Sequence, residues 1–99
     1  MDSGAENTVS SFEGRISVDN STQMRNRLRA DLKLNPRELT VDLSHVTSID
    51  ISGLATLVEA NRVARCQGTR LKIAGIQGQV ELLFEISHLD HILNAVPER

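Results

Sequence analysis

The apolar residues of this chain follow two spacings, which alternate along its length. Period two over residues 39–43 is typical of a half-buried strand, and a repeat of every four residues over 24–32 is typical of one helix face. We therefore predict strands over 10–18, 38–43 and 70–74, helices over 21–34, 52–67 and 79–86, and a short apolar segment over 89–96. Such alternation favours an α/β fold, with a mixed sheet covered by helices.

Glycine and proline mark the ends of several predicted elements. Asn35-Pro36 ends the first helix, since proline disfavours helical geometry in the residue before it. Gly68 supplies the positive φ that closes many helices. We predict one domain over residues 1–99, with a weakly ordered amino terminus over 1–9.

Composition narrows the possible functions. The 99 residues carry a net charge of -2 and only two aromatic residues, both phenylalanine, so binding should rest on aliphatic contacts. The same features argue against nucleic-acid binding, which needs a basic surface and stacking rings. A polar, acidic start, a lone Cys66 and the lack of any apolar run of bilayer length indicate a cytoplasmic protein.

The junction between the second predicted strand and the second predicted helix carries most of the functional information. It reads Asp50-Ile51-Ser52-Gly53-Leu54 and places Ser52 at a helix start, where free backbone N–H groups favour a hydroxyl cap or a phosphate. No catalytic triad, carboxylate pair, phosphate loop or metal-ligand spacing stands out. We therefore predict a binding module rather than an enzyme, with no catalytic residues, cofactor or metal.

This junction, with two flanking segments, resembles the STAS domain of bacterial anti-sigma factor antagonists over residues 12–93. The flanking segments are Gly14-Arg15-Ile16-Ser17 and Gly68-Thr69-Arg70-Leu71-Lys72-Ile73-Ala74-Gly75. The resemblance implies a single STAS-like domain with a mixed four- to five-stranded sheet and helices mainly on one face. It also implies binding to an anti-sigma factor that is a serine-protein kinase, and regulation of transcription by partner switching.

The resemblance also assigns candidate site residues. The family's junction usually reads Asp-Ser-Ser-Gly-Leu or Asp-Ser-Thr-Gly-Leu, and the hydroxyl residue directly after the Asp is phosphorylated. Ile51 holds that position here, so Ser52 becomes the phosphorylation candidate. A family aspartate near residue 17 is replaced by Ser17, and Asp19 is the neighbouring carboxylate. The partner-binding candidates are therefore Ser17, Asp19, Asp50, Ile51, Ser52, Gly53 and Leu54.

Several alternatives stay open at this level. Ser52 is a helix cap, or the phosphoacceptor, or an unmodified residue beside an Ile51 that keeps the protein permanently active. Asp50 either caps the helix or shapes the contact surface. The alternative function is a STAS-type accessory subunit of a membrane transporter, docking through the same helix.

Overall fold

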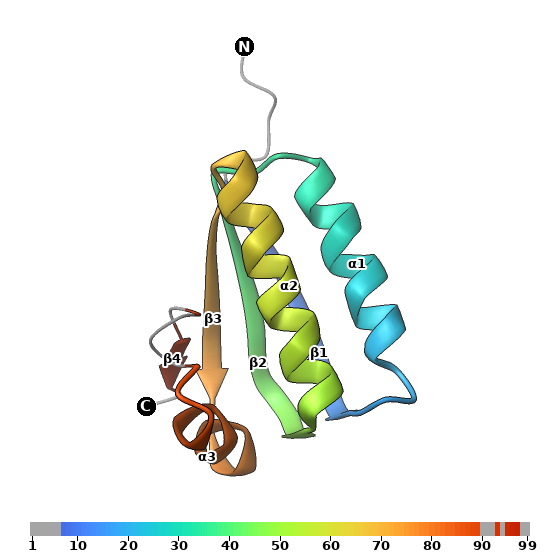
Figure 1. The fold of residues 1–99 in the computed structure, drawn as a ribbon, viewed down its shortest axis with the longest axis vertical. Helices are drawn as coiled ribbons and strands as arrows, with labels where there is room; N and C mark the ends of the chain where they lie inside the picture. Colours follow the sequence, from blue (N-terminus) through green and yellow to red (C-terminus); the bar gives the residue numbers. More distant parts are fainter. Residues whose placement is uncertain (1–6, 90–92, 94, 98–99) are drawn as a thin grey trace.

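A parallel sheet with helices packed on one face forms the fold, as seen in a computed structural model of the chain (Figure 1). The structure describes residues 7–89, 93 and 95–97. In chain order the elements are β1 (Asn7–Ile16), α1 (Ser21–Lys33), β2 (Glu38–Ile49), α2 (Ile51–Gln67), β3 (Arg70–Ile76), α3 (Gly78–Ile86) and β4 (Ala95–Pro97).

The strands lie in the order β1-β2-β3-β4, and every neighbouring pair within the described residues is parallel. The α/β class and the helices on one face are confirmed, with α1 and α2 side by side over the sheet (Figure 1). The expectation of a mixed four- to five-stranded sheet is corrected in two respects, because the described pairs are all parallel and only three of the strands are long. Three long strands form the sheet, and β4 adds only three residues at its edge. Each strand is joined to the next through a helix, and such a crossover returns the chain in the same direction.

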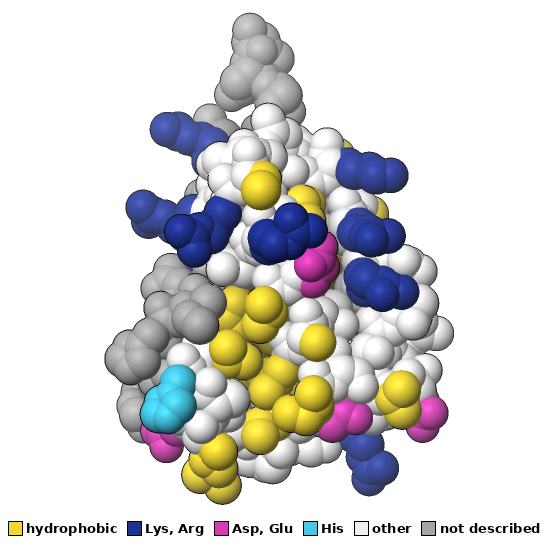
Figure 2. All heavy atoms as spheres, viewed as in Figure 1, with side chains coloured by type: hydrophobic (Ala, Val, Ile, Leu, Met, Phe, Trp, Pro, Cys, Tyr) yellow, Lys and Arg dark blue, Asp and Glu magenta, His cyan; other side chains and the backbone are white. Residues whose placement is uncertain are grey.

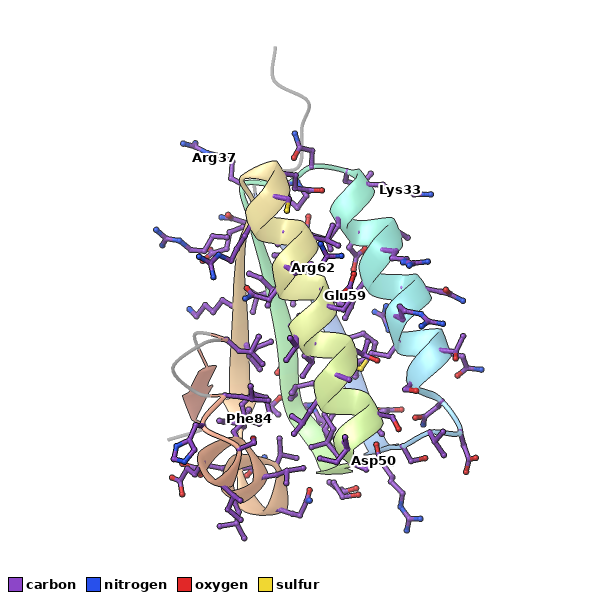
Figure 3. The ribbon with its side chains drawn as sticks, in the orientation of Figure 1. Lys33, Arg37, Asp50, Glu59, Arg62 and Phe84 are labelled. Atoms are coloured by element: carbon purple, nitrogen blue, oxygen red, sulfur yellow. The ribbon has the colours of Figure 1, made fainter. Side chains whose placement is uncertain are left out.

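The core lies between the sheet and the helices and is built almost entirely from aliphatic side chains. Met24, Leu28 and Leu32 are all buried, which confirms the apolar face predicted for α1. Phe84 of α3 is the largest fully buried side chain (Figure 3). Val58 of α2 is 37% exposed.

β2 is longer than its apolar spacing indicates. We expected a strand over 38–43, but β2 continues to Ile49. The second half pairs with β1, where Glu13 lies opposite His45 and Ile16 opposite Ile49. Two irregularities in this register accompany the loss of strict period two in the sequence.

Both ends of the chain also differ from the expected elements. β1 begins at Asn7, so residues 7–9 belong to a strand rather than to a weakly ordered terminus, while residues 1–6 lie outside the described part. Of the last apolar segment, the structure describes Leu89, the buried Leu93 and strand β4. Within the described ranges, no helix is both long and apolar enough to cross a membrane.

Candidate functional site

Asp50 starts α2 and is its N-cap. Its Oδ1 accepts a hydrogen bond from the backbone N–H of Gly53 at 3.2 Å, and its carbonyl accepts one from Leu54 at 3.0 Å. The expectation that Ser52 caps this helix is therefore wrong, because Ser52 is already the second helical residue. A carboxylate at this end also interacts favourably with the positive end of the helix dipole.

The same aspartate ties the junction to the loop between β1 and α1. Its Oδ2 accepts a hydrogen bond from Val18 N–H at 3.2 Å, and its own N–H donates to the Ile16 carbonyl at 3.1 Å. The capping role expected as one alternative for Asp50 is confirmed, and the same side chain also fixes the loop that holds Ser17 and Asp19.

Ser17 and Asp19 lie in this loop at the same end of the sheet as Asp50. Ser17 N–H donates to Asn20 Oδ1 at 2.9 Å, and Ser17 Oγ accepts from Asp19 N–H at 3.2 Å. Their polar groups therefore shape the turn into α1. Contact with Asp50 is made by the main chain of Val18, a residue that the sequence reasoning did not single out and whose side chain is 71% exposed.

Of the remaining junction residues, Ile51 is exposed, Ser52 is half-buried, and Gly53 and Leu54 are buried. Ile51 is 68% exposed, and Ser52 is half-buried with its main-chain carbonyl accepting from Thr56 Oγ1 at 2.9 Å. Leu54 is buried. A Cβ on Gly53 would lie 2.5 Å from Ile49 Cγ1, so this position must be glycine for α2 to approach the sheet so closely. Gly53 and Leu54 thus hold the start of α2 against the core, and this contact sets the position of Ile51 and Ser52.

Figure 2 shows hydrophobic side chains gathered over the first half of α2 and over α3. The large exposed apolar residues of these two helices are Ile51, Val58, Leu82 and Ile86, which we name the α2–α3 apolar patch. Leu82 and Ile86 are 55% and 64% exposed. The sequence reasoning missed the α3 half of the patch. A sequence signal did exist, since apolar residues follow one another around α3 and exceed what one buried stripe needs.

Gln79 holds α3 against the junction. Ile49 N–H donates to Gln79 Oε1 at 2.9 Å, and Gln79 Nε2 donates to the Ile49 carbonyl at 3.1 Å. Both bonds end on the residue directly before Asp50, so the first turn of α3 and the start of α2 are fixed to one strand end. A single glutamine thirty positions away carries no sequence pattern that predicts this link.

Charge on this side of the molecule is separated from the apolar patch. Lys and Arg side chains gather over the other half of the α1–α2 surface (Figure 2). Among them Arg62 pairs with Glu59 at 2.7 Å, and its hydrogen bond lowers the pKa of the Glu59 carboxyl while the pKa of Arg62 is raised. No three metal-ligating side chains within the described part of the chain come together as a metal site.

Comparison with known proteins places this geometry in a family. A family model described as "Mlab, STAS domain" matches residues 2–95. The chain therefore belongs to the STAS domain family.

Solved structures with the same fold come from two functional groups. One is an anti-sigma factor antagonist from Mycobacterium paratuberculosis, with a TM-score of 0.85, 19% identity, and coverage of 95% of this chain and 80% of that one. A second is the anti-sigma factor antagonist SpoIIAA in its unphosphorylated form. Its TM-score is 0.79 and its identity 16%, and the match covers 96% of this chain and 84% of that one. A third is the STAS domain of a SulP transporter from Vibrio cholerae. Its TM-score is 0.73 and its identity 21%, and the match covers 95% of this chain and 75% of that one.

Proposed function

We propose that this protein is a regulatory binding protein of the anti-sigma factor antagonist type, which binds an anti-sigma factor with serine kinase activity. The observation that carries the proposal is Ile51, which is 68% exposed at the first residue of α2 and belongs to the α2–α3 apolar patch. Asp50 and Gln79 hold the surrounding main chain rigid, so binding orders little new structure. The non-enzymatic, cytoplasmic character expected from the sequence belongs to the same proposal.

Aliphatic burial supplies the affinity in this interface. Covering an isoleucine side chain contributes about 1.5–3 kcal/mol, and each 1.4 kcal/mol corresponds to about a tenfold change in affinity. Ile51, Leu82 and Ile86 each expose more than half of their surface, so the patch holds several such contributions. The shortage of aromatic residues makes these aliphatic contacts the main anchors.

Phosphorylation of Ser52 is the proposed control. Asp50 already caps α2, so the hydroxyl of Ser52 is not needed for that purpose. A phosphate there adds roughly -1.5 to -2 charges beside the Asp50 carboxylate and the exposed Ile51, which opposes burial in an aliphatic interface. The helix dipole offsets only about 0.3–1 kcal/mol of that cost.

The proposal is tested by affinity purification of the tagged protein from its native cells. Mass spectrometry identifies the bound proteins and reads the phosphorylation state of the peptide that contains residues 48–52. We expect a kinase-type anti-sigma factor among the partners. Phosphate is expected on Ser52 in the unbound pool. A native protein that never carries phosphate at Ser52 under any growth condition would contradict the control mechanism.

Substitutions then locate the interface with the partner so identified. Ile51→Glu and Ser52→Asp are each expected to weaken binding about tenfold or more, whereas Ser52→Ala keeps it. Leu34→Glu is a matched control. Leu34 is 55% exposed, but it directly follows the carboxyl end of α1, whereas the loop at the amino end of α1 is the one that contacts Asp50. Equal binding by Ile51→Glu and wild type would move the interface away from the junction.

A transporter accessory subunit is the second candidate function. The fold likeness to the STAS domain of the SulP transporter supports it. The same purification separates the two functions, because transporter subunits would then replace the kinase among the bound proteins.

A further inference from the structure

The end of the molecule opposite the junction carries four exposed cations. Lys33 ends α1, Arg37 lies in the loop before β2, Arg65 lies in the last turn of α2, and Arg70 begins β3. All four side chains are exposed. Figure 3 shows Lys33 and Arg37 at the end of the molecule that is far from Asp50. We name these four residues the basic end.

The carboxylates nearest to the basic end are less accessible than the cations. Asp31, in the last turn of α1, and Glu38, at the start of β2, are both only partly exposed. Asp31 Oδ2 accepts a hydrogen bond from Ser10 Oγ at 2.6 Å, so this carboxylate faces β1. Glu38 lies opposite Arg70 in the register of the sheet. Within the described part of these segments, the fully exposed charges are therefore all positive.

An exposed leucine accompanies these cations. Leu34 directly follows α1, lies between Lys33 and Arg37 in the chain, and is 55% exposed. A single leucine at a surface is ordinary. An apolar side chain flanked by cations, however, is the combination that binds at a membrane interface, where one part enters the lipid and the other meets anionic headgroups.

The loop that carries Leu34 is fixed by two side chains from the connection between α2 and β3. Gln67 Nε2 donates to the Leu32 carbonyl at 2.8 Å, and the buried Thr69 donates from its Oγ1 to the Pro36 carbonyl at 2.7 Å. The exposed position of Leu34 is thus built into the fold. Binding through this loop orders little new structure, so little affinity is lost to ordering.

We propose that the basic end binds the surface of membranes rich in anionic lipids, with Leu34 entering the headgroup region and the four cations contacting lipid phosphates. Each Lys or Arg near such a surface contributes about fivefold in affinity. The junction lies at the other end of the molecule and faces away from the bound membrane (Figure 3). A partner at Ile51 and a membrane at Leu34 can therefore be held at the same time.

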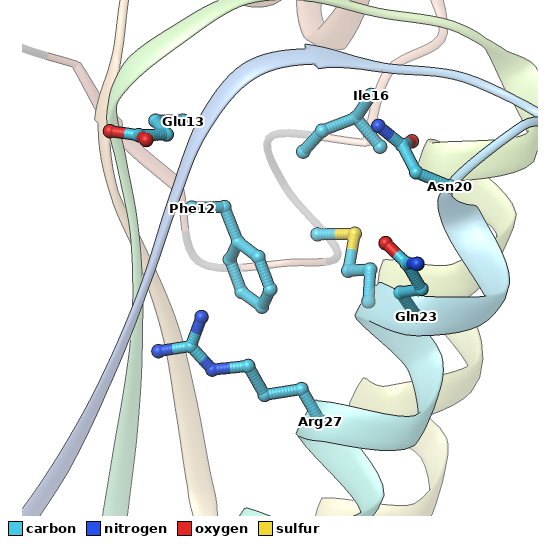
Figure 4. A pocket seen from close by; sticks show the side chains of 7 residues that line it. Phe12, Glu13, Ile16, Asn20, Gln23 and Arg27 are labelled. Atoms are coloured by element: carbon cyan, nitrogen blue, oxygen red, sulfur yellow. The ribbon is translucent and has the colours of Figure 1, made fainter.

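Nucleic acid fits this surface less well than lipid does. A duplex offers phosphates but no apolar region for Leu34, and neither phenylalanine is free to stack on a base. Phe84 is fully buried. The Arg27 guanidinium lies 4.9 Å from the centre of the Phe12 ring, beside a hollow between β1 and α1 (Figure 4).

Co-sedimentation of the full chain with lipid vesicles tests the proposal. One set of vesicles contains equal parts of phosphatidylglycerol and phosphatidylcholine, and the other contains phosphatidylcholine alone. We expect binding to the anionic vesicles at about 0.1 M salt, little binding to the neutral ones, and weaker binding as salt rises. The full chain is needed because Asp2 and Glu6 precede β1, which begins at this end of the sheet opposite Glu38.

Substitutions at the two ends of the molecule give matched comparisons. Arg37→Gln and Arg70→Gln are each expected to weaken vesicle binding about fivefold, and Leu34→Ser about five- to tenfold. The bond from Arg70 N–H to the Arg37 carbonyl, at 2.9 Å, is made by the main chain and stays in both variants. Arg15→Gln and Val18→Ser change exposed residues near the junction and should leave vesicle binding unchanged.

The remaining outcomes each overturn the proposal. Circular dichroism of every variant should match wild type, because the changed side chains are exposed. No binding to anionic vesicles overturns membrane binding itself, and an equal loss in Arg15→Gln and Arg70→Gln overturns the basic end as its site. Duplex DNA is offered in the same salt. Tighter binding to DNA than to anionic vesicles, unaffected by Leu34→Ser, would make this a nucleic-acid surface instead.

Discussion

Single residues at the junction set how closely its elements approach one another. Gly53 allows α2 to lie against the end of β2, and Asp50 uses both carboxylate oxygens, one for the helix start and one for the β1–α1 loop. These contacts hold Ile51 at the surface, where the proposed partner meets it.

Gly53→Ala is expected to destabilise the protein by about 1–3 kcal/mol, because the new Cβ overlaps Ile49 Cγ1 at 2.5 Å and Ile16 Cγ2 at 2.9 Å. Urea unfolding monitored by circular dichroism measures the change. Ala55→Ser, one added atom at an exposed position of α2, is the control and should shift stability by less than about 0.5 kcal/mol. Equal effects of both changes would show that the space at Gly53 is not limiting.

Asp42 gives the molecule a defined response to acid. Hydrogen bonds with Ser44, whose N–H lies 3.0 Å from Asp42 Oδ1, hold the pKa of Asp42 below its usual value, and His45 and Ser11 act in the same direction. A lowered pKa in the folded state means that the carboxylate stabilises the fold above the ordinary aspartate pKa. That stability is lost as pH falls through the lowered value.

Asp42→Asn is therefore expected to lower stability slightly at neutral pH, by less than about 1 kcal/mol for this partly exposed group, and to flatten the loss of stability in acid. Thermal unfolding of both proteins across an acid-to-neutral pH series measures this. If the two curves fall in parallel toward low pH, Asp42 does not contribute to acid sensitivity.

At the scale of elements, α3 depends on a link that joins it to β2. The helix packs through Phe84 and Val80, both fully buried, and Gln79 fixes its first turn by two hydrogen bonds to Ile49. The exposed Leu82 and Ile86 are thereby kept in a constant position relative to Ile51.

Gln79→Ala is expected to cost about 1–2 kcal/mol, because the N–H and the carbonyl of Ile49 lose their side-chain partner. Hydrogen exchange should show faster exchange of the Ile49 amide in particular. Gln23→Ala, at an exposed glutamine of α1, is the matched control and should leave that amide unchanged. Unchanged protection of Ile49 in Gln79→Ala would mean that the link contributes nothing to the position of α3.

For the molecule as a whole, the parallel direction of α1 and α2 separates charge along one axis. Lys33 lies in the last turn of α1 and Arg65 in the last turn of α2. Asp50, at the start of α2, lies at the opposite end of the molecule from Lys33 (Figure 3). Cations at helix carboxyl ends and a carboxylate at the amino end are each favoured by the helix dipole. The chain is close to neutral overall, yet the junction end and the basic end offer different surfaces to partners.

The sequence alone determined the elements whose signal is local. The spacing of Met24, Leu28 and Leu32 predicted α1, and period two predicted the first half of β2, because one buried face imposes these repeats. Gly68 ended α2 with φ 84, as its lack of a Cβ allows. The junction motif also predicted the STAS family and the end of the sheet at which its candidate site lies.

Tertiary structure decided what depends on residues far apart in the chain. The second half of β2 forms because β1 pairs with it, and the all-parallel order follows from the helical crossovers. Asp50, not Ser52, caps α2, and Gln79 fixes the first turn of α3 to the strand end directly before Asp50. Local spacing reports only which face of an element is buried. Register, caps and composite surfaces are set by hydrogen bonds and packing between segments that the spacing does not connect.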